Sequence, residues 1–268
     1  MRRILILGGT AEARRLAAEL AGRADLYVTL SLAGRTASPA AQPVPVRVGG
    51  FGGAEGLAHY LASERIDALI DATHPYAATI SANAAYAAQQ ARTPMLALRR
   101  LPWAATAGDH WIDVPDVVTA VRALGSEPRR VFLALGRKEL APFVGAPQHH
   151  YLVRSVDPVD PPLAVPHAAY LTARGPFYEA DERALLKRNG IAVIVAKNSG
   201  GSATYGKIAA ARELALPVIM LRRPSLPEAP TVSTVEEACA WLAHILTLST
   251  AHDCEPRHRS TTKSVESR

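Results

Sequence analysis

The chain has 268 residues, 49% hydrophobic and 20% charged, which suits two domains or one large domain with a buried core. No stretch reaches about 18 uninterrupted apolar residues, which argues against a transmembrane helix. The apolar run from Ile4 to Leu7 is short for a signal peptide, and no small-residue cleavage site follows it. The two cysteines, Cys239 and Cys254, have no partners at metal-ligand spacing. We therefore expect a cytoplasmic protein without a disulfide framework or a membrane partner.

The chain carries 30 basic and 24 acidic side chains, a net charge of +6. Such an excess is typical of proteins that bind nucleic acids, membrane surfaces or acidic metabolites. The basic residues are scattered, and many lie at or just after the ends of apolar runs; no Lys/Arg-rich run with interleaved aromatics occurs. This distribution favours a small acidic ligand and predicts no nucleic-acid partner.

Short apolar runs alternate with helical patterns along the whole chain. In the first half they predict strands at 3–7, 26–31, 44–48, 68–71 and 95–98, and helices at 11–21, 54–64 and 77–91. In the second half they predict strands at 110–114, 130–135, 150–154, 168–173, 192–196 and 218–221, and helices at 117–124, 179–188, 204–214 and 235–246. Continuous Ile/Leu/Val runs are typical of parallel strands that are covered on both faces.

Two such sets predict an α/β fold with two doubly wound parallel-sheet lobes, Rossmann- or flavodoxin-like, and a cleft between them. The rhythm breaks near 99–109, and the prolines of 157–166 predict a loop. We expect an N-terminal lobe at 1–100, a C-terminal lobe at 101–248 and a disordered polar tail at 249–268. Ligands of such folds bind beyond the carboxyl ends of the strands, so the loops there are the candidate sites.

The loop after the first strand reads Gly8-Gly9-Thr10 and leads into the helix at 11–21. Glycine lets a ligand approach the backbone closely, and Thr10 can cap a helix whose free N–H groups attract phosphate. The loop is not the dinucleotide motif G-x-G-x-x-G, because Thr10 and Ala13 stand at its second and third glycine positions. A capped tight turn without a ligand is the alternative.

The loop after the second strand contains Ser31, Arg35 and Thr36. NAD-binding folds usually place Asp or Glu here to hold the ribose 2′-hydroxyl, and this loop has no acid. The Arg35 guanidinium matches a 2′-phosphate in charge and geometry, so NADPH is favoured if a nicotinamide cofactor binds. The alternative is a solvated surface arginine.

Two more loops of the first half could carry chemistry. The segment VGGFGG at 48–53, which includes Gly50, would let a ligand approach the backbone, or is a flexible turn. The segment DATHPYA at 71–77 ends the fourth strand, where Thr73 could cap the next helix. His74 and Tyr76 could donate hydrogen bonds to a substrate or cofactor, and a purely structural helix start is the alternative.

Loops of the second half are cationic. They contain Arg137, Lys138, Arg174, Lys197, Ser199, Gly200 and Lys207. Cations at a helix start oppose the helix dipole, so an anion between them would relieve the conflict. The loop at 197–207 lacks the spacing of a P-loop, and each of these segments alone could be a plain surface loop.

Other chemistries find little support in the sequence. No nucleophile elbow and no paired-carboxylate site can be placed, and the nine histidines show no H-E-x-x-H spacing. We therefore predict neither a hydrolase nor a metal site.

Taken together, the segments GGTAEA, SLAGRT, VGGFGG, DATHPYA, LALGRK, ARGPF and KNSGGSATYGKIAAARELALPVIMLRRP resemble the precorrin-6A reductase family of cobalamin biosynthesis. The resemblance covers about residues 4–246. It implies an oxidoreductase that reduces one double bond of the precorrin-6A macrocycle, or of its cobalt form, to precorrin-6B with NADPH. It also implies two α/β lobes and a substrate rich in acetate and propionate groups, which would give the cations a purpose.

From the loops and the resemblance we assign expected roles. The expected cofactor-binding residues are Gly8, Gly9, Thr10, Ser31, Arg35, Thr36, Gly50 and Thr73. The expected catalytic residues, near the nicotinamide end, are Asp71, His74 and Tyr76. The expected substrate-binding residues are Arg137, Lys138, Arg174, Lys197, Ser199, Gly200 and Lys207.

Some alternatives stay open. His74 and Tyr76 are candidate proton donors, and solvent is another. The rival functions are another NADPH-dependent reductase and a non-catalytic protein that closes two lobes on an anion. The expected partner is the small tetrapyrrole alone, bound by a monomer or weak oligomer.

Overall fold

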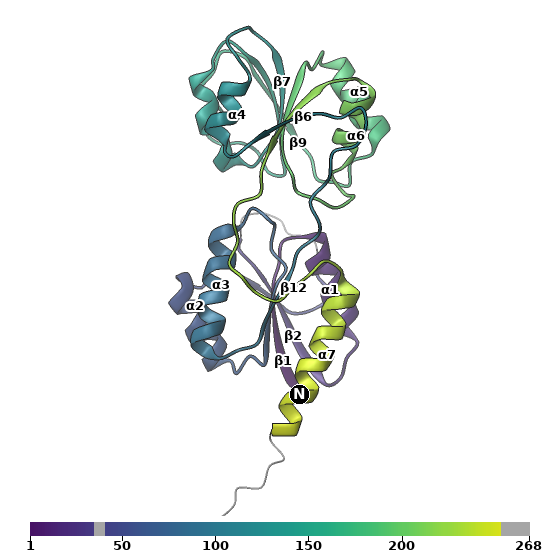
Figure 1. Ribbon diagram of the computed structural model, residues 1–268. Coiled ribbons are helices and arrows are strands. Elements are labelled where there is room, and N and C mark those ends of the chain that lie inside the picture. The colour runs from purple at the N-terminus through teal and green to yellow at the C-terminus, as the bar shows by residue number, and fades with distance from the viewer. Residues whose placement is uncertain (35–40, 253–268) are drawn as a thin grey trace, which may run out of the picture.

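The computed structural model describes residues 1–34 and 41–252, except for the side chains beyond Thr247. It has two lobes, each built on a six-stranded sheet with helices on both faces (Figure 1). Every strand pair is parallel, which confirms the predicted α/β class and its two doubly wound sheets. No described helix combines the length and apolar character that a membrane span requires.

The first sheet has the strand order β12-β5-β4-β1-β2-β3. Its strands are β1 (Arg2–Leu7), β2 (Leu26–Leu32), β3 (Val46–Val48), β4 (Ala68–Asp71), β5 (Met95–Leu98) and β12 (Thr231–Val232). Its helices are α1 (Ala11–Ala21), α2 (Gly53–Ser63), α3 (Ala78–Ala91) and α7 (Val235–His252). One core lies between the sheet and α1 with α7, and another lies under α2 and α3.

The second sheet has the order β6-β11-β10-β7-β8-β9. Its strands are β6 (His110–Val114), β7 (Arg130–Ala134), β8 (His150–Ser155), β9 (Ala168–Thr172), β10 (Val193–Lys197) and β11 (Pro217–Leu221). Its helices are α4 (Val117–Ala123), α5 (Glu179–Arg188) and α6 (Gly206–Glu213), with two 3₁₀ turns, η1 (Arg137–Glu139) and η2 (Ala141–Gly145). Helix α4 covers one face, and α5 and α6 cover the other.

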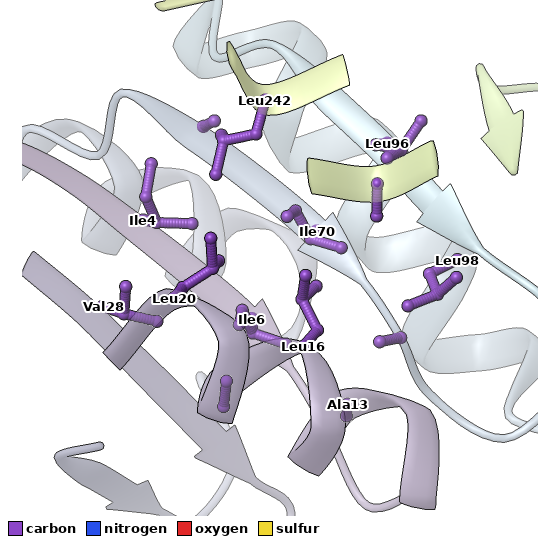
Figure 2. Close-up of a cluster of buried hydrophobic side chains, with 14 of the residues drawn as sticks. Ile4, Ile6, Ala13, Leu16, Leu20, Val28, Ile70, Leu96, Leu98 and Leu242 are labelled. Atoms are coloured by element: carbon purple, nitrogen blue, oxygen red, sulfur yellow. The ribbon is translucent and has the colours of Figure 1, made fainter. Parts of the chain in front are cut away.

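The C-terminal segment departs from the predicted domain division. Strand β12 pairs with β5, and α7 packs beside α1 on the first sheet, so this segment belongs to the first lobe and not to a lobe at 101–248. The reason is burial: Leu242 and Leu246 of α7 complete the core that Leu16 and Leu20 of α1 begin (Figure 2). Helix α7 continues to His252, so the predicted tail at 249–268 starts as helix; residues 253–268 lie outside the described part.

We expect the Leu242→Ala substitution to lower the free energy of unfolding by about 3 kcal/mol, because Leu242 is 2% exposed in the first core. Urea unfolding would measure the change. His244→Ala is the matched control, since His244 is exposed on the same helix. Equal effects of the two substitutions would contradict the packing of α7 on the first sheet.

Candidate functional site

The loops that follow β4, β10 and β11 contact each other across the two lobes. The Tyr76 hydroxyl donates a hydrogen bond to the carbonyl of Leu221 and accepts one from the Asn198 backbone N–H at 2.8 Å. Tyr76 follows β4 in the first lobe, whereas Leu221 ends β11 and Asn198 directly follows β10. The carboxyl ends of the two sheets therefore face each other, which is where parallel sheets bind ligands.

Two chain segments cross between the lobes, and arginines fasten them to the loop after β10 (Figure 1). Arg100 donates from Nε to the Ser199 carbonyl at 2.7 Å and from Nη1 to Glu12 at 2.8 Å. Arg223 donates from Nε to the Asn198 carbonyl at 2.9 Å and from Nη1 to the Arg100 carbonyl at 2.8 Å. Both crossings and the loop thus form one hydrogen-bonded unit next to α1.

Asn198 and Trp103 extend this unit into the second lobe. The Asn198 side chain accepts from the Trp103 backbone N–H at 2.8 Å and donates to the Trp103 carbonyl at 2.9 Å. The Trp103 indole donates to the Gly201 carbonyl at 2.8 Å. The sequence prediction missed both residues as site residues: Trp103 lay in a stretch that showed only broken periodicity, and nothing marked Asn198 as its partner.

Gly200 has a structural reason to be glycine. Its φ is +69°, and a Cβ there would lie 2.1 Å from the Leu101 carbonyl oxygen and 2.6 Å from an Arg223 nitrogen. The crossing segment therefore fills the space on the side where a Cβ of Gly200 would lie, and the predicted contact between Gly200 and substrate stays a prediction. Ser199, also predicted to bind substrate, uses its backbone carbonyl to hold Arg100 and Arg223.

The glycine turn after β1 fits an anionic ligand. Thr10 caps α1 by accepting from Ala13 N at 3.1 Å, and its hydroxyl donates to the Ala72 carbonyl at 2.7 Å. Gly9 has a φ of +112°, and no atom lies within 4 Å of the point where its Cβ would be. A Cβ on Gly8 would lie 2.6 Å from Leu30, so Gly8 packs the turn and Gly9 opens it.

The neighbouring loops are placed only in part. Ser31 is buried at the end of β2, and its carbonyl accepts from Gly8 N at 2.9 Å. Arg35 and Thr36 lie outside the described residues. Gly50 belongs to a loop with open space around it, and Arg47 holds that loop by donating to the carbonyls of Gly49 and Gly50.

Asp71 is held by its own lobe. It is 1% exposed and accepts from the Thr73 hydroxyl and from the Ser81 hydroxyl, each at 2.6 Å. Arg99 lies 3.6 Å from the same carboxylate. Asp71 and Thr73 therefore shape the loop that carries His74, and direct contact of either with a ligand, as predicted, would require these bonds to be given up.

His74 is neutral in this environment. Burial, followed by the positive charges of Arg100, Lys197, Arg223 and Lys207, lowers the pKa of His74 to about 3. The cations come from the two crossings and from the second lobe, so His74 faces an electropositive region. Its Nδ1 accepts from the Tyr76 backbone N–H at 3.3 Å, which assigns the ring proton to Nε2.

The Tyr76 hydroxyl already has hydrogen-bond partners. Burial raises the pKa of Tyr76 to about 12, and its hydroxyl already makes the two bonds to the second lobe. The Lys197 ammonium lies 5.1 Å from the centre of the Tyr76 ring. Tyr76 thus joins the lobes and places His74 two residues away.

The predicted cations of the second lobe differ in their surroundings. Arg137, Lys138 and Arg174 are exposed in the loops after β7 and β9. Lys197 pairs with Glu139 at 2.6 Å. Lys207 is 4% exposed and donates to the Thr204 carbonyl at 2.6 Å, so its ammonium is directed to the loop before α6, and its predicted contact with substrate carboxylates stays a prediction.

Lys207 supports the loop that follows β10. Its ammonium lies 4.9 Å from the Trp103 ring centre, and burial lowers the pKa of Lys207 to about 7. The charge of Arg154 lowers this pKa further, and the charge of Glu182 opposes it. A buried amine against an indole fixes the position of Trp103 between the lobes.

The arrangement brings a neutral imidazole, an open glycine turn at a helix start and several cations to the place where two sheets meet. It can hold a phosphate-bearing cofactor against a second anionic ligand. No group of three or more His, Cys, Asp or Glu side chains is placed to hold a metal ion within the described ranges.

Comparisons with known proteins agree with this geometry. The family model described as precorrin-6x reductase CbiJ/CobK matches residues 3–243. A precorrin-6A reductase from Sinorhizobium sp is 58% identical over 91% of this chain and 94% of its own length. One from Rhodobacter capsulatus is 49% identical over 91% and 96%. A solved structure described as CobK precorrin-6A reductase has a TM-score of 0.88 at 49% identity and covers 91% of this chain and 97% of that one.

We expect acid to destabilise the protein through His74. The pKa of His74 in the fold lies below its ordinary value of 6.5, so between pH 6.5 and about 3 only the unfolded chain binds this proton. The free energy of unfolding should therefore decrease as the pH is lowered through that window, with a limiting slope of about 1.4 kcal/mol per pH unit for this proton. Urea unfolding of wild type and His74→Gln across the window would measure it. Parallel curves for the two proteins would contradict a buried, neutral His74.

Proposed function

The chain belongs to the precorrin-6x reductase CbiJ/CobK family, and from this premise we propose that it reduces the precorrin-6A macrocycle to precorrin-6B with NADPH. The family establishes an oxidoreductase that uses a redox cofactor. NADPH, the product and the residue roles below are our proposals. We also propose that the enzyme works in the cytoplasm, in keeping with a chain that has only two cysteines.

The meeting of both sets of strand ends around His74 supports this function most directly. Burial and, after it, four cations from the crossings and the second lobe lower the pKa of His74, although His74 belongs to the first lobe. A reductase needs its cofactor and substrate in contact, and a polycarboxylate substrate needs cations at that point. An electropositive site between the two lobes would bring cofactor and substrate into contact and would supply cations for the substrate carboxylates.

The first lobe would hold the cofactor. The N–H groups at the start of α1 and the open Gly9 suit the pyrophosphate, and the open loop at Gly50 lies after the neighbouring strand β3. Arg35 and Thr36 would take the 2′-phosphate at the end of β2. When bound, NADPH supplies the hydride.

The second lobe would hold the substrate. Arg137, Lys138 and Arg174 are exposed cations after the carboxyl ends of its strands and suit acetate and propionate groups. Lys197 lies closer to Tyr76 and His74, and its partner Glu139 keeps it in place. A substrate carboxylate here would share Lys197 with Glu139.

The structure argues for solvent as the source of the proton that follows the hydride. His74 is neutral, because its pKa is lowered to about 3, and the Tyr76 hydroxyl has a pKa raised to about 12 and is engaged between the lobes. At neutral pH His74 therefore has no imidazolium proton to give, and Tyr76 releases its proton less readily than an ordinary tyrosine. We propose instead that His74 orients a ligand by donating from Nε2, as an uncharged donor that does not compete with the surrounding cations.

Both curated relatives reported above are named for precorrin-6A without cobalt. We therefore propose the metal-free macrocycle as the substrate. Anaerobic assays with each form would compare kcat/KM, and a clear preference for the cobalt form would reverse this choice.

Turnover tests the function as a whole. Purified protein mixed with NADPH and precorrin-6A should lower the absorbance of the reduced pyridine at 340 nm while the tetrapyrrole spectrum changes, one NADPH for each macrocycle. Thermal stabilisation by both ligands without either spectral change would indicate a binding protein instead. Turnover with NADPH and another acceptor alone would indicate a different reductase.

We expect Arg35→Ala to raise the KM for NADPH by on the order of tenfold and to leave the KM for NADH nearly unchanged, because only NADPH carries the 2′-phosphate. Steady-state kinetics with each cofactor would measure both values. Arg35→Lys is the matched control, which keeps the charge and removes the planar fork. Equal effects on the two cofactors would remove Arg35 from the 2′-phosphate site.

A further inference from the structure

We propose that an aromatic pocket in the second lobe receives an apolar edge of the tetrapyrrole ring. This inference rests on the proposed function and adds a second kind of contact to it. The cationic loops account for carboxylates, but they leave the flat conjugated ring without a surface. The pocket supplies that surface beside the meeting place of the lobes.

The pocket lies among the loops that follow β9 and β10 and along α6, and it has a volume of about 620 Å³. Its walls come from the first crossing, from the first residue of α5 with the loop before it, and from α6 as far as Arg212 with the loop before it. The aromatic members are Trp103, Phe177, Tyr178 and Tyr205. Such a set in one concave surface is typical of sites for planar ligands.

One aromatic side chain at this pocket has no evident structural task. Tyr178 is 67% exposed, although tyrosine gains stability from burial of its ring. Trp103 and Tyr205 lie with ring centres 5.6 Å apart at 60°, so they already form an edge-to-face pair. Tyr178 is thus available at the entrance of a pocket whose other aromatics are fixed.

The cation that lines the pocket, Arg212, and the nearby cation Arg154 are both paired, and the lining carboxylate of Glu179 is exposed. Arg212 donates to the two carboxylate oxygens of Asp109 at 3.0 and 3.1 Å and to the Tyr205 hydroxyl at 2.5 Å. The guanidinium of Arg154 lies 3.7 Å from the Phe177 ring centre and is bound by the buried carboxylate of Glu182. The pocket therefore offers aromatic surface and not free cations, which selects the ring and not its carboxylates.

Bonds continue from the pocket to the candidate site. Trp103 lines the pocket and bonds to Asn198, and the Asn198 backbone N–H donates to the Tyr76 hydroxyl, two residues from His74. Gly201 also lines the pocket, and its Cβ position lies 2.9 Å from Arg100. A large planar ligand bound in the pocket would extend toward the cations of the candidate site.

Contacts of Lys207 and Gly206 support the shape of the pocket. Lys207 lies beneath the Trp103 ring and binds the Thr204 carbonyl, as described above. Gly206 allows close approach, since a Cβ there would lie 2.5 Å from the Phe177 carbonyl. These contacts support the walls without a ligand, and a wall that is already formed lowers the cost of ordering on binding.

The test is the Tyr178→Ala variant. We expect its KM for precorrin-6A to rise by on the order of tenfold, the size of effect that loss of an aromatic binding contact usually has. The KM for NADPH should stay unchanged, because Tyr178 belongs to the second lobe. Tyr178→Phe should behave as wild type, since the ring and not the hydroxyl makes the contact.

Tyr86→Ala is the matched control, because Tyr86 is 46% exposed on α3, away from the pocket. The dissociation constant of precorrin-6A, measured by fluorescence quenching without NADPH, should rise in Tyr178→Ala by the same factor as the KM. Wild-type turnover with unchanged KM and dissociation constant in Tyr178→Ala would overturn the pocket assignment alone. Absence of wild-type turnover would overturn the proposed function itself, whatever the variant does.

Discussion

The Tyr76 hydroxyl is the contact through which the two sheets present their carboxyl ends to each other. It bonds to the backbone of both Leu221 and Asn198, so it holds the ends of β11 and β10 against the loop after β4. A side chain that bonds backbone fixes position more tightly than one that bonds another flexible side chain. The loops of one lobe thereby become the surroundings of the other, and the charge around His74 follows from this.

The electrostatics of the site are a consequence of that geometry. Cations that are exposed to solvent interact weakly with distant groups, because solvent and salt screen their charge. When the lobes meet, burial of the His74 imidazole lowers its pKa most, and the cations that face it add to this effect, so that the pKa falls to about 3. A neutral His74 keeps its hydrogen-bonding capacity without adding to the positive charge. The positive charge that would attract a polycarboxylate therefore adds to burial in keeping His74 neutral.

The predicted elements agree closely with the structure because the signals were local. Apolar runs bounded by glycine or polar residues predicted Ala11–Ala21 and Ala68–Asp71 to the residue. Strand β12 was missed because its two residues carry no periodicity of their own and are strand only through pairing with β5. The return of α7 to the first sheet was missed for a related reason. The apolar face of α7 predicts a helix that packs on a sheet but does not say which one. Chain order suggested the second sheet, because that sheet is nearer in sequence.

The candidate site shows the same division between local and distant information. Thr10 was predicted as a helix cap from its neighbours alone, and the structure confirms the cap. Lys207 was predicted to bind substrate carboxylates, because only the fold places it against Trp103. Cations at strand ends in this chain thus have two kinds of surroundings. Arg100 and Arg223 donate hydrogen bonds to backbone carbonyls and so join the lobes, whereas Arg137 and Lys138 are exposed. The number of cations in the sequence does not distinguish these two kinds of surroundings. The difference is whether the fold brings a backbone carbonyl within hydrogen-bonding distance of the cation.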